Sequence, residues 1–402
     1  MRQRCGGFTG GAGMTKTLAS GPRNVARVEA LEGARGLAAF VVVLFHLPGW
    51  NHALYDVAVI RNGYLMVELF FVLSGFVIFR TYSTRLVTIG DLARFQFLRF
   101  GRLYPVHLVM LLLYLGLEVL KLVAERHFGL RATTSAAFVG TDWGAFVQHL
   151  LLVQAIGPLG RAETFNIPAW SISVEFYTYL LFGSLLLLLR RRHLLIGVGL
   201  TASVVCLGLL ATGHTLGWQY LMRGVGGFFL GCGISYLTEV RRVTLPRGAS
   251  VTAAAVLVLF LALKRPHQAD VAIFGFAALL VLCLVADGDA GTPAALTSRV
   301  LRWLGEVSYS LYMTHALVLW IANQTLRVML KAPVAPVDGV LTPQLPIAEA
   351  LVAIVVALAA SLLVAWAMST LVERPWRLRS RRVVGAPNPP GLPVVGASVE
   401  SS

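Results

Sequence analysis

The stretch that decides the fold reads Glu32-Gly33-Ala34-Arg35-Gly36-Leu37-Ala38-Ala39-Phe40-Val41-Val42-Val43-Leu44-Phe45-His46. It is an apolar run with an arginine at its N-terminal end and a histidine eleven residues further on. In an α-helix, eleven residues return to within about 20° of the starting direction and rise roughly 16 Å. We therefore predict one helix that carries Arg35 and His46 on the same face.

The composition of the whole chain predicts a membrane protein. Its 402 residues are 57% hydrophobic and only 13% charged, whereas soluble proteins carry about 25% charged residues. The apolar residues gather in separate runs, and a helix needs about 20 of them to cross a bilayer. We predict an all-α, polytopic membrane protein with about ten transmembrane helices. The spans are expected near 36–50, 64–81, 103–121, 171–189, 194–212, 219–237, 250–264, 269–286, 307–329 and 348–371.

The basic residues predict the orientation of the chain. The net charge of +15 does not indicate a nucleic-acid partner, because the basic residues lie between the apolar runs rather than on one face. If the spans alternate from a cytoplasmic N-terminus, most of the 34 Lys and Arg residues fall in cytoplasmic segments, as the positive-inside rule requires. Both termini are predicted to be cytoplasmic, and the apolar piece 146–156 to be an interfacial or re-entrant helix.

Three regions follow from this reading. Residues 1–30 form a basic arm, rich in Gly, Arg and Thr, that is predicted to be disordered and to contain no cleavable signal peptide. Either Met1 or Met14 can be the start of translation. Residues 31–378 form the membrane domain, and 379–402 a basic tail with Pro and Gly that is predicted to be disordered. The four cysteines show no spacing typical of a metal site.

Charged groups near or inside the predicted spans are the candidate site residues. They are costly in a bilayer, so a working role is the default interpretation for Arg35 and His46. Arg99 and Arg102 are three residues apart, share a face of a helix, and make a fork suited to phosphate oxygens. Ordinary positive-inside anchoring is the alternative for these two arginines.

Two further stretches carry polar residues into spans. Glu175, in Trp170-Ser171-Ile172-Ser173-Val174-Glu175-Phe176-Tyr177, must be paired, protonated or functional, and pairing with a histidine is one alternative. Ser308, Tyr309, Tyr312 and His315 are spaced to form a polar stripe on one helix. A structural hydrogen bond is as plausible for His315 as a direct role.

Six motifs together resemble the acyltransferase-3 family of membrane O-acyltransferases. Each is weak alone, but all six occur in order over about residues 30–378. They are the pair Arg35 and His46, the segments 70–76, 99–105 and 170–177, the segment 304–312 with His315, and the segment 372–375. The resemblance implies a ten-helix domain in the bacterial inner membrane, and the family modifies bacterial glycans and some antibiotics.

The resemblance also implies an activity. An acyl group, often acetyl, would pass from acyl-coenzyme A to a hydroxyl of a glycan or related sugar-containing acceptor, with a macrolide as the alternative acceptor. Arg35, Arg99 and Arg102 would bind the donor's phosphates, and His46 would be the general base, because imidazole titrates near neutral pH. No bound cofactor or metal is expected. Glu175 would orient His46 or bind the acceptor.

Supporting positions are expected on two helices, at Ser171 and along the stripe of Ser308, Tyr309 and His315. Direct transfer is favoured over an acyl-enzyme, because no Ser or Cys stands beside a base by sequence spacing. Two alternatives remain. One is a proton-coupled transporter with His46, Glu175 and His315 as a relay, although no inverted repeat is visible. The other is an acyl carrier that serves a separate transferase.

Overall fold

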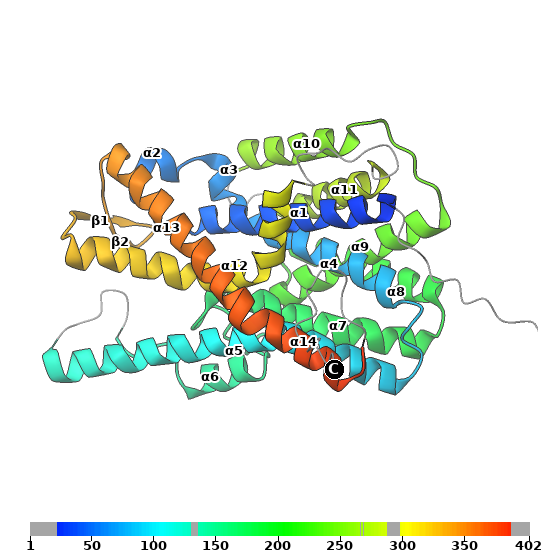
Figure 1. The fold of residues 1–402 in the computed structure, drawn as a ribbon, viewed down its shortest axis with the longest axis horizontal. Helices are drawn as coiled ribbons and strands as arrows, with labels where there is room; N and C mark the ends of the chain where they lie inside the picture. The colour runs from blue at the N-terminus through cyan, green and yellow to red at the C-terminus, as the bar shows by residue number, and fades with distance from the viewer. Residues whose placement is uncertain (1–21, 130–135, 266, 268, 288–297, 387–402) are drawn as a thin grey trace, which may run out of the picture.

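The computed structural model describes residues 22–129, 136–265, 267, 269–287 and 298–386. Within these residues the chain is a bundle of long helices with one small β-hairpin (Figure 1). The long helices are α1 (Pro22–Phe45), α4 (Met66–Tyr82), α5 (Ile89–Phe128), α7 (Trp170–Leu189), α8 (Arg192–Thr212), α9 (Gln219–Val240), α10 (Ala249–Leu263), α11 (Ala272–Asp287), α12 (Arg299–Gln324) and α13 (Ile347–Met368).

Short elements connect or extend these helices. They are α2 (His52–Tyr55), α3 (Ala58–Arg61), η1 (Gly63–Leu65), α6 (Trp143–Leu150), η2 (Ile167–Ala169), the π-helical turn η3 (Thr325–Met329), strands β1 (Val334–Val337) and β2 (Val340–Pro343), the π-helical turn η4 (Ser369–Glu373) and α14 (Arg374–Val383). The two strands are antiparallel, and Val337 pairs with Val340 at the turn. Figure 1 shows the hairpin, α2 and α3 at the left end of the bundle, where α1 also ends, and α14 toward the right.

Each predicted span overlaps one of the long helices, although α1 ends at Phe45, before His46 and before the predicted end of the first span at residue 50. By length and apolar composition, five helical segments of the described residues can cross a membrane: Gly63–Tyr82, Ile89–His127, Ile167–Leu189, Arg192–Thr212 and Ile347–Val383. Helices α10 and α11 are apolar but shorter. Several apolar helices of this length support a multi-pass membrane protein, whereas ten crossings and cytoplasmic termini stay predictions.

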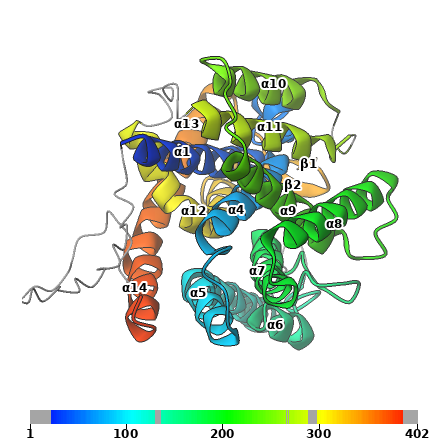
Figure 2. The same cartoon turned by 90° about the vertical axis from the view of Figure 1, so that its right-hand side faces the viewer.

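Helices α1, α9 and α12 fall outside those five segments. They carry polar side chains such as Arg35, Arg223 and His315 along their length. Neighbouring helices cover these residues, because α1 packs along α12 and α9 packs along α4. Viewed along the bundle, α4 and α12 lie in the middle, with α8 and α10 at the periphery (Figure 2). Polar groups therefore concentrate on the helices that other helices shield from lipid.

Glycines allow the closest of these helix contacts. A Cβ on Gly75 of α4 would overlap the backbone of Phe228 in α9, and a Cβ on Gly231 would overlap the backbone at Val72. The pair of α1 and α12 is built in the same way, because a Cβ on Gly36 would overlap the backbone at Gly305. Small residues let membrane helices approach closely.

Three boundaries differ from the predictions. Helix α1 begins at Pro22, so residues 22–30 are helical rather than disordered, whereas 1–21 lie outside the described residues. Helix α5 begins at Ile89, so the predicted loop before the third span is helical from there onward. Its first turn is closed by a capping box in which Thr88 and Asp91 exchange hydrogen bonds. Helix α14 continues to Val383, into the tail predicted to be disordered.

Candidate active site

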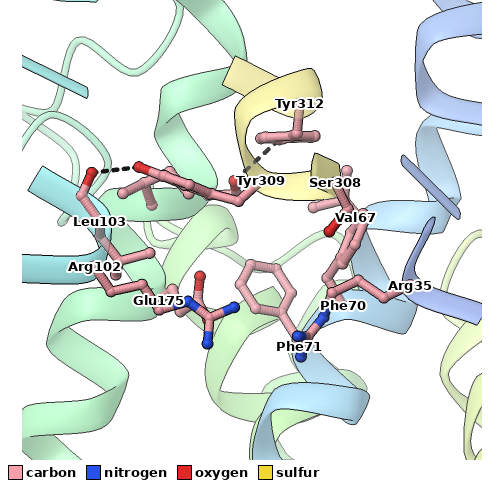
Figure 3. A pocket seen from close by; sticks show the side chains of 12 residues that line it. Arg35, Val67, Phe70, Phe71, Arg102, Leu103, Glu175, Ser308, Tyr309 and Tyr312 are labelled. Atoms are coloured by element: carbon pink, nitrogen blue, oxygen red, sulfur yellow. Dashed lines mark hydrogen bonds between the residues drawn. The ribbon is translucent and has the colours of Figure 1, made fainter. Parts of the chain in front are cut away.

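A cavity of about 60 Å³ lies between α1, α4, α5, α7 and α12. That volume has room for a few water molecules, at about 10–15 Å³ each. Figure 3 shows the side chains of Arg35 and Arg102 reaching into it from opposite sides. Seven residues singled out from the sequence line it: Arg35, Arg102, Ser171, Glu175, Ser308, Tyr309 and Tyr312. The rest of the wall is Val67, Phe70, Phe71, Leu103 and Ile172.

Hydroxyl groups hold the Glu175 carboxylate. Ser74 of α4 donates to Glu175 Oε1 at 3.1 Å, and Tyr179 donates to the same oxygen. The Ser74 and Tyr179 hydroxyls are themselves 2.6 Å apart. Among the described residues, the hydrogen-bond partners of Glu175 are therefore hydroxyl groups rather than a histidine. Tyr179 follows Glu175 by four residues, a helical spacing visible in the sequence.

Arg99 and Arg102 occupy different surroundings on α5. Arg99 donates to the Tyr82 hydroxyl at 2.9 Å and lies 5.2 Å from the centre of the Tyr82 ring and 5.9 Å from that of Tyr179. Arg102 lines the cavity, and Arg99 does not. Tyr179 lies between the two environments, because its ring faces Arg99 while its hydroxyl binds Glu175.

His46 and His315 form the second polar centre. His46 lies immediately after α1, and its Nδ1 is 3.3 Å from Nε2 of His315 on α12. Each Nδ1 also meets the backbone carbonyl four residues earlier, at 2.9 Å from Val42 and 3.1 Å from Leu311. His315 is completely buried. The histidine singled out for catalysis thus has a histidine partner from a helix 269 residues away in sequence.

These contacts assign the protons of the two rings. A carbonyl oxygen only accepts hydrogen bonds, so both Nδ1 atoms carry hydrogen. Nε2 of His315 is then a lone-pair nitrogen, and the one hydrogen on His46 Nδ1 is shared between it, at 3.3 Å, and the nearer Val42 carbonyl. The remaining nitrogen of His46, Nε2, is left unprotonated in the neutral ring. This tautomer is assigned from the hydrogen bonds rather than observed, and it leaves His46 able to take up a proton at Nε2.

Tyr312 lies between the cavity and the histidine pair. It lines the cavity, and its ring centre is 5.9 Å from that of His315. Its hydroxyl donates to the Pro168 carbonyl at 2.9 Å and accepts from Ser171 at 3.0 Å. His46 does not line the cavity, although Arg35 and His46 both meet residues of α12. The two side chains thus share the face of α1 that meets α12.

Glu68 and Arg223 form a buried ion pair that the sequence did not connect. Arg223 Nε is 2.6 Å from Glu68 Oε1, and the guanidinium lies 4.4 Å from the centre of the Trp170 ring. Glu68 is 2% exposed, so it requires a charged partner. Both residues fall within predicted spans, and the packing of α4 against α9 brings them together.

The chain matches a protein family over most of its length. A family model described as an acyltransferase domain covers residues 28–366. The chain belongs to the acyltransferase-3 family. Acyltransferase MdmB of Streptomyces mycarofaciens is 29% identical over an alignment of 332 residues that covers 74% of this chain and 80% of the relative. Peptidoglycan O-acetyltransferase OatA of Listeria monocytogenes serovar 1/2a is 24% identical over an alignment of 339 residues that covers 75% of this chain and 51% of that protein. No solved structure matches.

This membership confirms the resemblance inferred from the six motifs. The protein is an O-acyltransferase of a membrane-bound family, and its several apolar helices agree with that class. The chain matches about half the length of OatA. In the part of the chain that the structure describes, no group of three or more His, Cys, Asp or Glu residues is arranged to hold a metal ion.

Proposed function

We propose that the protein transfers an acyl group, acetyl in the simplest case, from acyl-coenzyme A to a hydroxyl of a glycan. The reaction would take place in the bacterial inner membrane, with both termini in the cytoplasm. The observation that carries the proposal is the contact between His46 and His315, because it leaves a lone-pair nitrogen on the same helix face as Arg35. A base and a cationic cavity along one helix are what acyl transfer from a charged donor needs.

Positive charge near the cavity supports coenzyme A as the donor. Arg35 and Arg102 reach into the cavity, and Arg99 lies three residues before Arg102 on α5. Guanidinium groups bind phosphate through paired, charge-assisted hydrogen bonds, and coenzyme A carries several phosphate charges. The cavity is too small for the whole donor, so the nucleotide would bind outside it and only the thioester arm would pass inward.

His46 would act as the general base of a direct transfer. Its Nε2 would remove the proton of the acceptor hydroxyl while that oxygen attacks the thioester carbonyl carbon. Collapse of the tetrahedral intermediate would break the C–S bond, and the imidazolium would return the proton to the leaving thiolate. The Val42 carbonyl and His315 would together keep the lone pair of His46 at Nε2. Glu175, held by Ser74 and Tyr179, would act on groups bound in the cavity rather than orient His46.

A glycan acceptor is supported by one relative. OatA is named as a peptidoglycan O-acetyltransferase, and its match covers 75% of this chain. Hydroxyls of a sugar are suitable nucleophiles only when a base is positioned beside them, which is the role given to His46. A macrolide hydroxyl would meet the same chemical requirement and is the second acceptor class to test.

The proposal is tested with the purified full-length protein in liposomes. We expect radiolabelled acetyl-coenzyme A to lose its label to peptidoglycan-derived oligosaccharides, with thiol release that depends on the acceptor. A macrolide in place of the oligosaccharide tests the other class. Thioester cleavage without any labelled acceptor would indicate an acyl carrier. Acceptor movement across the membrane without thioester cleavage would contradict the proposal and favour a transporter.

A further inference from the structure

Helix α14 brings additional arginines to the donor side of the cavity. It follows the π-helical turn η4 and packs against α5, an arrangement seen in both overall views (Figures 1 and 2). The crossing point is Gly101, where a Cβ would lie 2.5 Å from the side chain of Ser380. Gly101 lies between Arg99 and Arg102 in sequence, so α14 crosses α5 at the two arginines already given to the donor.

Helix α14 has arginines on two faces, one of which is partly buried and the other exposed. Arg377 and Arg381 are four residues apart and share a face, and both are partly buried. The charges of Arg99 and Arg102 act on Arg377. Arg379 and Arg382 of the same helix are exposed. Ordinary positive-inside anchoring would not require the partly buried face to be turned toward other arginines.

The positive charge at this crossing is only partly balanced. Arg377 has one carboxylate partner, Glu373, at 3.5 Å, and Glu373 also accepts a hydrogen bond from Ser310 at 2.8 Å. Among the described residues, Arg99 and Arg102 have no carboxylate within ion-pair distance, and Nε of Arg99 is buried without a hydrogen-bond partner. Glu175 and Glu373 act on Arg102 from beyond ion-pair distance, and Glu32 acts on both Arg102 and Arg377. Several guanidiniums thus share a few carboxylates at this crossing, and a bound anion would relieve the repulsion among them.

We propose that α14 completes the binding site for the phosphates of acyl-coenzyme A, with Arg377 adding a guanidinium to those of Arg99 and Arg102. The inference rests on the proposed donor and adds a residue that none of the sequence motifs assigns. It also gives the π-helical turn a role, because π turns are frequent at functional sites. Here η4 ends at Glu373, and α14 begins at the next residue. The turn therefore determines the direction in which the side chain of Arg377 points.

The test compares two variants of the full-length protein that lose the same charge on the same helix. Arg377→Gln should weaken binding of coenzyme A and raise KM for acetyl-coenzyme A about ten- to a hundredfold, because one charge-assisted contact is lost. Arg379→Gln, on the exposed face, should change neither by more than about twofold. Arg377→Lys keeps the charge without the fork and should lie between Arg377→Gln and wild type.

A truncated donor separates binding of phosphate from chemistry. With the acetyl thioester of N-acetylcysteamine, which has no phosphate, Arg377→Gln and wild type should have equal kcat/KM. Coenzyme A binding by Arg377→Gln equal to that of wild type and of Arg379→Gln would overturn the site. Wild-type protein that binds coenzyme A through Arg377 but transfers no acetyl group would instead contradict the proposed function and leave this site in place. Wild-type protein that does not bind coenzyme A at all would overturn both.

Discussion

The two ends of the apolar stretch of α1 are built differently. Around Arg35 the neighbours are charged, with Arg102 and Glu175 on the same cavity. Around His46 the contacts are neutral, namely another imidazole and a backbone carbonyl. Concentrated charge suits the binding of an anion, whereas a neutral, hydrogen-bonded imidazole suits the movement of a proton. The difference indicates that donor binding and proton transfer are separated along one helix, and each prediction below tests that separation.

The largest effect is expected at the neutral end. His46→Ala should lower kcat by about a hundred- to ten-thousandfold, the range typical of a general base. Binding of coenzyme A should stay within about twofold of wild type, because His46 is outside the cationic region. Turnover and binding are measured on the same liposome preparation, with thermal unfolding as the control for folding. Turnover close to that of wild type would remove His46 from the mechanism.

A smaller loss is expected when only the tautomer of His46 is disturbed. His315→Leu removes the longer of the two contacts of His46 Nδ1, leaving the Val42 carbonyl as its acceptor, and should lower kcat about tenfold, consistent with the loss of one buried hydrogen bond. His315→Gln offers a carbonyl oxygen as a replacement acceptor and should recover part of that loss, with KM for the donor unchanged in both. If His315→Leu and His315→Gln have equal activity, His315 has a packing role alone.

The charged end should respond in KM rather than in kcat. Arg102→Gln removes one of the two guanidiniums in the cavity and is expected to raise KM for acetyl-coenzyme A about tenfold, with less than about threefold change in kcat. The double variant Arg99→Gln with Arg102→Gln should bind coenzyme A more weakly still. An Arg102→Gln variant that loses kcat and keeps KM would place Arg102 in the chemical step and abolish the proposed separation.

The smallest effect is expected far from both ends, at Asp142. Its ion pair with Arg161 and the backbone N–H of Ala145 lower the pKa of the carboxyl to about 2. Because this folded-state pKa lies below the ordinary value of 3.8, the stabilisation is present above 3.8 and lost as pH falls through 2. Asp142→Asn should therefore leave the pH–rate profile between about pH 5 and 8 superimposable on that of wild type. A shifted profile would link this loop to catalysis.

Local sequence patterns predicted much of the site. The eleven-residue spacing placed Arg35 and His46 on one face, because a helical period depends only on the chain between them. The apolar runs located the long helices for the same reason. The 40-residue length of α5 was missed because its arginines interrupt the apolar run, although Thr88 and Asp91 form a recognisable capping signal. The sequence likewise predicts a disordered tail from residue 379, because Arg379, Arg381 and Arg382 make the second half of α14 polar.

Long-range pairs could not be predicted from the sequence. His46 and His315 are 269 residues apart, and Glu68 and Arg223 are 155 apart, so only the packing of helices brings them together. The histidine partner considered for Glu175 is an example, because the structure shows the hydroxyl groups of Ser74 and Tyr179 in that place. A buried carboxylate needs hydrogen bonds, and which neighbour supplies them depends on how α4 crosses α7.

The central claim is that one donor molecule reaches from the cationic end of α1 to His46. A cryo-EM structure of the full-length protein with a non-cleavable thioether analogue of acetyl-coenzyme A tests it most directly. The account predicts the phosphates beside Arg99, Arg102 and Arg377, Tyr312 displaced, and the acetyl end within hydrogen-bonding range of His46 Nε2. Phosphates bound elsewhere, or an acetyl end that stops at the cavity without approaching His46, would contradict it.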